Sequence, residues 1–186
     1  MAMQRERPNR IRYYAGIALA VRARANCIGN KVGAILVRDD RIISTGYNGT
    51  PQGMRNCDEG GCERCAHRDR YPAGQGYDVC ICVHAEQNTL LSAARFGIAV
   101  EGASLYTTMK PCFGCAKELL QARVAAIYYL HDWTPGPAFA QQYAMLERQF
   151  PGGVHQVDVP DPDAEWAVSA LRSHGEPDTG HDAPRG

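Results

Sequence analysis

Two short motifs in the sequence contain residue types that bind zinc, and one of the motifs also contains a carboxylate. His84-Ala85-Glu86 begins one predicted helix, and Pro111-Cys112-Phe113-Gly114-Cys115 begins another, with Cys112 28 residues after His84. Because the positive end of a helix dipole stabilises a thiolate and proline suits a helix start, Cys112 and Cys115 occupy positions favourable for ligands. One histidine and two cysteines leave a fourth tetrahedral position for water, which is typical of a catalytic zinc.

Glu86 supplies the second half of the predicted chemistry. A zinc-activated water that attacks an amino-substituted ring carbon needs a base to accept its proton, and the ring nitrogen and the departing ammonia need protons in return. The order His-x-Glu…Pro-Cys-x-x-Cys is typical of zinc deaminases, in which this carboxylate performs both transfers. The alternative is a structural zinc knuckle in which Glu86 only offsets the helix dipole, but knuckles usually take four ligands from closely spaced pairs.

Alternating strands and helices are expected to position these motifs. Arg38-Asp39-Asp40 has the composition of a hairpin turn, residues 46–51 predict a tightly turned loop, and residues 52–79 are loop-like. The predicted strands are 32–37, 41–44, 104–108, 125–130 and 154–159, and the predicted helices are 10–25, 84–96, 112–122 and 137–149. This order predicts an α/β fold, a three-layer α/β/α domain with a mixed central sheet.

Length and composition indicate one catalytic domain over residues 1–172, followed by a disordered tail over residues 173–186. The 20 basic side chains balance 20 acidic ones, so we expect no polymeric nucleic acid as a partner. The first residues are charged and no apolar run approaches membrane-spanning length. The sequence therefore predicts a cytoplasmic protein with no membrane partner.

A wider resemblance covers roughly residues 10–131. Beyond the zinc motif it rests on Lys31 to Ile35, Arg41 to Pro51, His84 to Asn88, Leu105 to Thr108 and Pro111 to Lys117. On these residues the chain resembles the deoxycytidylate (dCMP) deaminase family of the cytidine deaminase superfamily, which includes late-competence-type bacterial members. Its Gly-Tyr-Asn-Gly block distinguishes this branch from the guanine, riboflavin-pathway and tRNA deaminases.

The resemblance implies hydrolytic conversion of dCMP to dUMP and ammonia, which supplies thymidylate synthesis. The substrate would be a free mononucleotide, and a zinc ion would be the cofactor. A different free cytidine or a modified dCMP is the alternative substrate. A noncatalytic, zinc-stabilised interaction module linked to DNA uptake is the alternative class of protein, which the neutral net charge and the complete proton-transfer motif disfavour.

The resemblance also gives a role to the loop that contains Gly46, Tyr47, Asn48 and Gly49. In oligomeric relatives this loop is part of an effector site where dCTP activates and dTTP inhibits, and Mg²⁺ would accompany a bound triphosphate. A plain turn with conformationally permissive glycines is the alternative. By the same resemblance we expect a homo-oligomer, between a dimer and a hexamer.

Arg95 matches a family arginine that is associated with the substrate phosphate or with subunit contacts. It follows His84 by eleven residues on the same predicted helix, which places it roughly 16 Å further along the axis. That distance is long for a nucleotide bound at the zinc of its own chain. We therefore expect Arg95 to serve a subunit interface or a neighbouring subunit's site, with a solvated helix charge as the alternative.

Six cysteines remain after the catalytic pair, and with no export signal they indicate metal binding rather than disulfides. By resemblance to phage relatives that carry a structural zinc, Cys27, Cys57 and Cys82 look like three of its ligands. The fourth ligand would come from Cys62, Cys65, His67 or Cys80. Because the chain has more thiols than one tetrahedral site can use, a second structural metal and free thiols both stay open.

Overall fold

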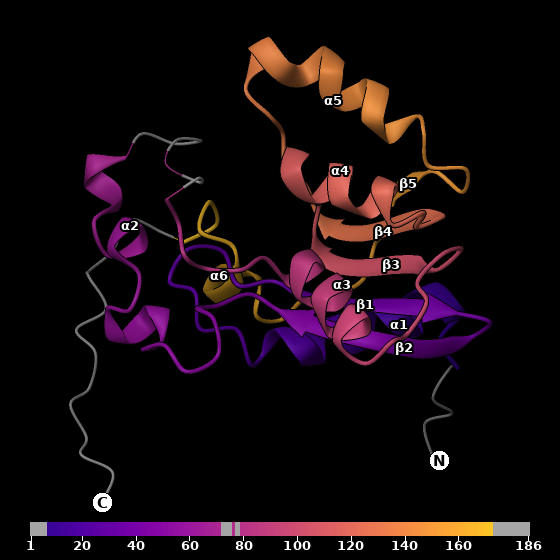
Figure 1. Ribbon diagram of the computed structural model, residues 1–186, viewed down its shortest axis with the longest axis horizontal. Coiled ribbons are helices and arrows are strands. Elements are labelled where there is room, and N and C mark those ends of the chain that lie inside the picture. The colour runs from indigo at the N-terminus through magenta and orange to yellow at the C-terminus, as the bar shows by residue number, and fades with distance from the viewer. Residues whose placement is uncertain (1–6, 72–75, 77–78, 173–186) are drawn as a thin grey trace, which may run out of the picture.

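A mixed β-sheet forms the centre of the molecule (Figure 1). The computed structural model describes residues 7–71, 76 and 79–172. Its strands are β1 (Gly33–Arg38), β2 (Arg41–Tyr47), β3 (Ser104–Met109), β4 (Ala126–His131) and β5 (Val154–Gln156). The strand order is β2-β1-β3-β4-β5, with β1 antiparallel to β2 and β3, and with β3, β4 and β5 parallel. The prediction of a mixed sheet is confirmed.

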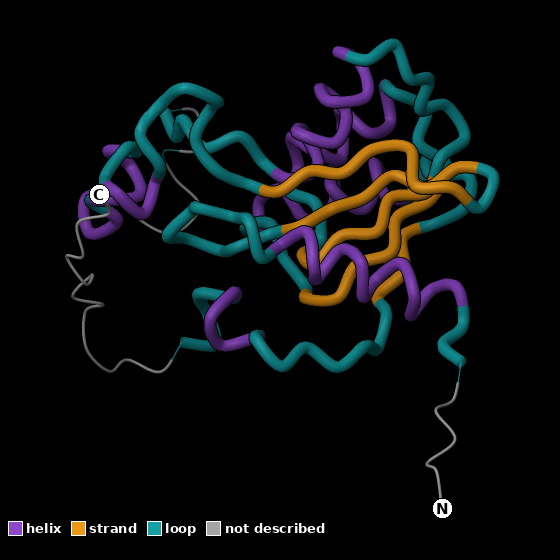
Figure 2. The backbone as a smooth tube through the Cα atoms, turned by 90° about the horizontal axis from the view of Figure 1, so that it is seen from below, coloured by secondary structure: helices purple, strands orange, loops and turns teal. Residues whose placement is uncertain are grey.

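Helices cover both faces of this sheet. Helix α1 (Arg10–Arg22) packs on one face, while α3 (Ala85–Arg95) and α4 (Phe113–Gln121) pack on the other, and α5 (Ala140–Glu147) lies against α4 (Figures 1 and 2). Strand β1 is buried along almost its whole length because α1 and α3 cover its two faces. The predicted three-layer α/β/α arrangement is therefore confirmed.

The hairpin between β1 and β2 forms where the sequence predicts it, but β2 is longer than expected. Asp39 and Asp40 have φ angles of 51° and 60°, as both central residues of a type I′ hairpin turn require. The prediction that a turned loop begins at Gly46 is wrong, because β2 continues through Tyr47 and Gly46 pairs with Ala34. A Cβ at Gly46 would lie 2.4 Å from a backbone oxygen of α3, so glycine permits the close approach of helix and strand.

The region predicted as loop contains short helical turns. These are η1 (Cys57–Glu59), α2 (Glu63–Ala66) and η2 (Arg68–Arg70), and they lie beyond the sheet at the left of Figure 1. The backbone N–H of Asp58 donates to the carbonyl oxygen of Asn26 at 3.0 Å, which attaches this region to the loop after α1. Residues 52–71 are therefore ordered partly by contacts with a segment 30 residues earlier.

Other differences from the sequence-based expectation are local. The helix expected over residues 137–149 is a 3-10 turn, η3 (Pro137–Phe139), followed by α5, and β5 ends three residues earlier than expected. A short helix, α6 (Ala164–Ala167), was not predicted. The predicted tail over 173–186 lies outside the described residues. Among the described residues, none of the helices combines the length and the apolar character needed to cross a membrane.

Candidate active site

The predicted zinc ligands meet where two helices begin. His84 is the N-cap of α3 and Cys112 is the N-cap of α4, while Cys115 lies in the first turn of α4. The backbone N–H of His84 donates to Oε1 of Gln87 at 3.0 Å, which holds the start of α3. Helices α3 and α4 pack against each other, so their N-termini bring the three side chains to one point.

The distances between these three side chains suit zinc. Nδ1 of His84 lies 3.4 Å from Sγ of Cys112 and 3.3 Å from Sγ of Cys115. A tetrahedral zinc ion with ordinary bond lengths would separate an imidazole nitrogen and a thiolate sulfur by about 3.6 Å. The trio therefore fits zinc with small adjustments. In the described residues it supplies three ligands, which is the number that a catalytic zinc takes from protein.

The three side chains also influence one another's protonation. Hydrogen bonds from Cys115 and His84 lower the pKa of the Cys112 thiol to about 4, although burial opposes this shift. The hydrogen bond to Cys112 raises the pKa of His84 to about 9, and sharing a proton with Cys112 raises the pKa of Cys115. A thiolate is thus favoured at this point, and a cation that replaces the shared protons would bind to it.

Glu86 lies beside the three ligands in the first turn of α3. Its side chain is buried, with 4% of the residue exposed, and its Oε2 lies 3.8 Å from Sγ of Cys115. Burial raises the pKa of Glu86 to about 7, although the charge of His84 opposes the increase. A carboxyl group in this place can both accept and return a proton near neutral pH.

A cavity of about 920 Å³ opens above the site, and His84, Glu86 and Cys112 form part of its wall. This volume lies in the usual range for small-molecule sites. Other parts of the wall come from Asn30, Val32, Asn48, Arg64, Arg68, Tyr71, Met109, Lys110, Trp133 and Ser169. Most of these were not among the predicted site residues, because they come from segments far apart in the sequence that only the tertiary structure brings to the site.

The loop that carries Cys112 is held by side chains that were not among the predicted site residues. The hydroxyl of Tyr143, on α5, donates to the carbonyl oxygen of Pro111, and the Tyr143 ring contacts Trp133 edge-on at 5.5 Å. Nζ of Lys110 lies 2.9 Å from Oε1 of Glu147. The position of Lys110 two residues before Cys112 could have suggested that it lies near the site, whereas nothing local in the sequence marks Tyr143.

The residues predicted for the effector loop lie in different environments. Asn48 reaches the cavity, but its Oδ1 accepts from the N–H of Val32 at 2.8 Å and its Nδ2 donates to the carbonyl oxygen of Asn30 at 2.7 Å. Tyr47 is 38% exposed. Gly46 packs on α3, and Gly49 packs on the Asn26 side chain and pairs with Val83. An effector role for these residues stays a prediction.

Arg95 lies at the far end of α3 and does not line the cavity. Its guanidinium lies 5.8 Å from the centre of the Phe96 ring. Phe96 is 69% exposed and Leu91, on the same helix, is 60% exposed. This position agrees with the long distance from His84 that the predicted helix implied. A role for Arg95 at a subunit interface stays a prediction.

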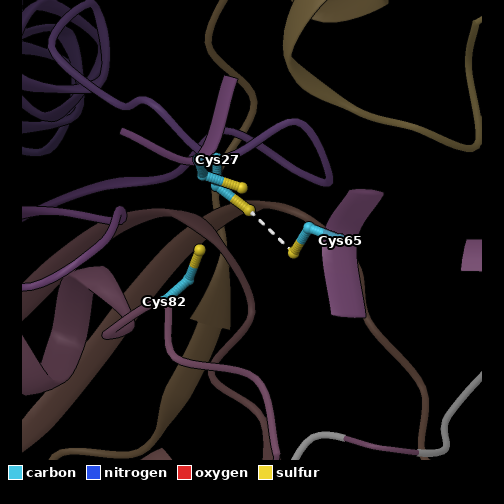
Figure 3. A group of neighbouring side chains, drawn as sticks. Cys27, Cys65 and Cys82 are labelled. Atoms are coloured by element: carbon cyan, nitrogen blue, oxygen red, sulfur yellow. Dashed lines mark hydrogen bonds between the residues drawn. The ribbon is translucent and has the colours of Figure 1, made fainter. Parts of the chain in front are cut away.

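The other six cysteines gather in one cluster that also borders the cavity. None of them forms a disulfide, and Cys27, Cys65, Cys80 and Cys82 line the cavity wall. Figure 3 shows the sulfurs of Cys27, Cys65 and Cys82 turned toward a common point. His67, which was considered as a ligand, lies outside the cluster with its Nε2 3.4 Å from Oε1 of Glu63.

Comparisons with known proteins identify relatives of this arrangement. A family model described as the cytidine and deoxycytidylate deaminase zinc-binding region matches residues 8–131. A deoxycytidylate deaminase of Schizosaccharomyces pombe is 41% identical over 127 residues, which are 66% of this chain and 38% of the relative. This chain therefore spans less than half the length of that relative. The deoxycytidylate deaminase of Mycobacterium phage D29 is 36% identical over 129 residues, which are 66% of this chain and 95% of the relative.

A solved structure resembles most of this chain. The dCMP deaminase of the cyanophage S-TIM5, in complex with dCMP and dUMP, has a TM-score of 0.61 and 27% sequence identity. The match covers 82% of this chain and 100% of the cyanophage chain.

Proposed function

The chain belongs to the cytidine and deoxycytidylate deaminase family, and from this membership and the geometry of its site we propose that it converts dCMP to dUMP and ammonia by hydrolysis. The observation that carries the proposal is the convergence of His84, Cys112 and Cys115 beside the buried carboxyl group of Glu86, in a cavity that suits a nucleotide. A wider role in supplying dUMP for thymidylate synthesis follows from this activity.

Each side chain has a separate task in the proposed reaction. His84, Cys112 and Cys115 would hold the zinc, and when bound the metal activates a water as nucleophile. Glu86 accepts the proton of the attacking water and returns protons to the pyrimidine ring nitrogen and to the departing amino group. Burial of Glu86 excludes bulk water, which keeps the transferred proton between the carboxyl group and the substrate.

Two arginines are suited to bind the substrate phosphate. Arg64, on α2, and Arg68, in η2, line the same cavity as Glu86. Lys110 and Asp69 also line the cavity, and Nζ of Lys110 lies 2.9 Å from Glu147 and 3.6 Å from Asp132. Guanidinium groups bind phosphate oxygens through paired hydrogen bonds. We assign the recognition of a 5′-monophosphate to Arg64 and Arg68.

The test is ammonia release by protein whose zinc content has been counted. The substrates are dCMP, dCTP, deoxycytidine and CMP, each with and without added dCTP or dTTP as effector. We expect dCMP to give the highest kcat/KM. If another cytidine is turned over in preference to dCMP, that compound replaces dCMP as the proposed substrate. If metal-replete protein releases ammonia from none of the four, the proposal is overturned.

Oligomerisation and regulation complete the proposed function. The exposed Leu91 and Phe96 flank Arg95 on α3, and such an apolar pair beside a cation supports a contact between subunits of a homo-oligomer. Regulation by dCTP and dTTP, with Mg²⁺ accompanying the triphosphate, is the corresponding proposal for Gly46 to Gly49. Normal oligomerisation and normal kinetics in an Arg95→Ala protein would contradict the role of Arg95.

A further inference from the structure

Six thiols lie together beside the active site, and they come from three separate segments. Cys27 follows α1. The short helical region carries Cys57, Cys62 and Cys65. The segment before α3 carries Cys80 and Cys82. All except Cys80 are buried, with at most 7% of each residue exposed. This cluster packs as its own unit, apart from the main core.

The sulfur atoms form two overlapping groups of four. Cys27, Cys57, Cys65 and Cys82 are one group whose sulfurs all lie within 4.8 Å of one another, and Cys62, Cys65, Cys80 and Cys82 are the other. Cys65 and Cys82 belong to both. Sγ of Cys65 lies 4.0 Å from Sγ of Cys27 and 3.7 Å from Sγ of Cys80, and the sulfurs of Cys62 and Cys80 are 3.8 Å apart.

These separations are those of thiolates around tetrahedral zinc. Zinc–sulfur bonds of about 2.3 Å at tetrahedral angles put neighbouring sulfurs about 3.8 Å apart. Two independent zinc sites, each with four cysteine ligands, would need eight thiols, and the cluster has six. Two ions can therefore both be four-coordinate only if they share two thiols. The two groups share Cys65 and Cys82.

We propose that this cluster binds two zinc ions bridged by the thiolates of Cys65 and Cys82. Cys27 and Cys57 are the terminal ligands of one ion, and Cys62 and Cys80 are those of the other. The proposal concerns a centre separate from the single catalytic zinc, and it does not depend on which substrate the enzyme takes.

Two positive side chains, Lys31 and Arg172, contact the backbone of the loop that follows Cys27. Six thiolates and two Zn²⁺ leave a net charge of about −2. Nζ of Lys31 donates to the carbonyl oxygen of Cys27 at 3.0 Å, and Arg172 donates to those of Ile28 and Gly29 at 2.9 and 2.7 Å. These cations offset the residual charge of the cluster.

Disulfides and an iron–sulfur cluster explain the arrangement less well. A disulfide joins one sulfur to one other at about 2.05 Å, whereas Cys65 is almost equally close to Cys27 and Cys80. An iron–sulfur cluster takes four cysteines and inorganic sulfide, which would leave two of the six thiols without a role. A single zinc would likewise leave either Cys27 and Cys57 or Cys62 and Cys80 unused.

The cluster also has a consequence for the neighbouring cavity. It joins the segment that carries Arg64 and Arg68 to the residues that precede His84, and four of its thiols line the cavity. Metal binding therefore fixes one wall of the proposed substrate site.

The first experiment counts metals in the full-length protein and does not use activity. Mass spectrometry of metal-saturated protein should give about three zinc ions per chain, one catalytic and two in the cluster. In protein exchanged with ¹¹³Cd, the two cluster ions should show ¹¹³Cd–¹¹³Cd coupling through the shared thiolates. Two or fewer zinc ions per chain, disulfides found by alkylation without reductant, iron with sulfide, or three ions without coupling would each overturn the proposal.

A variant removes one terminal ligand. Cys62→Ala should bind about two zinc ions per chain and lose the ¹¹³Cd coupling, while the ion at Cys27 and Cys57 remains. A Cys62→Ala protein that retains all three ions and the coupling would contradict the assignment. If this variant does not fold, the metal count and the coupling in the unaltered protein still decide the question.

Discussion

Replacing Asp161 by asparagine is expected to destabilise the protein strongly. Asp161 accepts two hydrogen bonds from the Arg22 guanidinium, both 2.6 Å long, and its Oδ2 lies 2.7 Å from Nε2 of His131. The side chains of Arg22 and Asp161 are only 2% and 4% exposed. The pair joins the end of α1 to the segment before α6, so its loss would leave a buried guanidinium without its counter-charge.

The loss in free energy of unfolding caused by Asp161→Asn can be calculated in two ways. Removing one member of a buried ion pair usually costs about 3–5 kcal/mol, because the other charge stays buried and uncompensated. Burial alone would raise the pKa of Asp161, but hydrogen bonds from Arg22 and His131 outweigh it and lower the pKa from 3.8 to about 2. That difference corresponds to about 2 kcal/mol of stability. The larger figure applies to the variant because it also includes the cost of the unpaired Arg22.

The pH dependence has a definite sign. Because the folded-state pKa of Asp161 is depressed, its contribution is complete above the unfolded pKa near 4 and is lost as the pH falls through about 2. The stability difference between the unaltered protein and Asp161→Asn should therefore become smaller below pH 4. Zinc loss in acid affects both proteins and largely cancels in this difference.

Equilibrium unfolding in urea, in zinc-containing buffer at pH 7, measures the effect. With an m value of about 2 kcal/mol/M, Asp161→Asn should lower the urea midpoint by roughly 1.5–2.5 M. Glu101→Gln is the matched control, because Glu101 and Arg123 form an ion pair of 2.8 Å with side chains 67% and 74% exposed. The control should shift the urea midpoint far less than Asp161→Asn does, because solvent screens an exposed ion pair. Equal, small losses in both variants would refute the reasoning.

Three further changes test the active site and its surroundings. Glu86→Gln should keep its fold and zinc while kcat for dCMP falls at least ~100-fold, because an amide cannot accept the proton; near-normal turnover would contradict its role. Gly46→Ala should lower the free energy of unfolding, measured by thermal denaturation, by about 1–3 kcal/mol, because the new Cβ would lie 2.4 Å from a backbone oxygen of α3. Gly16→Ala is the control: its Cβ would meet no atom within 4 Å, so it should not destabilise the protein. Arg68→Ala should reduce kcat/KM for dCMP more than for deoxycytidine, and Arg70→Ala, outside the cavity, should leave that ratio unchanged.

The convergence of the candidate site residues could be anticipated from the sequence because their positions depend on local structure. His84 and Cys112 each stand where the composition predicts a helix start, and both are N-caps in the structure. Glu86 and Cys115 then follow from the geometry of a single helical turn. The one tertiary requirement is that the two helix starts meet, and they meet because α3 and α4 pack against each other.

The remaining features depend on contacts between residues far apart in the sequence. Arg22 and Asp161 are 139 residues apart and neither position carries a local signal. The order of residues 57–71 comes from contacts with the loop after α1, so the sequence of that region alone suggested only a loop. The extension of β2 through Gly46 was missed for a related reason. Glycine is locally typical of a turn, whereas here it allows α3 to pack closely on the strand.

The cysteine cluster and the active site share a wall because of a simple alternation along the backbone. Residues two apart on extended chain point to the same side. Cys80, Cys82 and His84 are spaced in this way before α3 begins, and all three line the cavity. Ile81, between them, is 37% exposed and Val83 pairs with Gly49. One short segment therefore carries two ligands of the proposed binuclear centre and one ligand of the proposed catalytic zinc. Because Cys112 and Cys115 are held separately by α4, disturbance of the cluster should move His84 relative to the other two ligands, and thereby couple the cluster to catalysis.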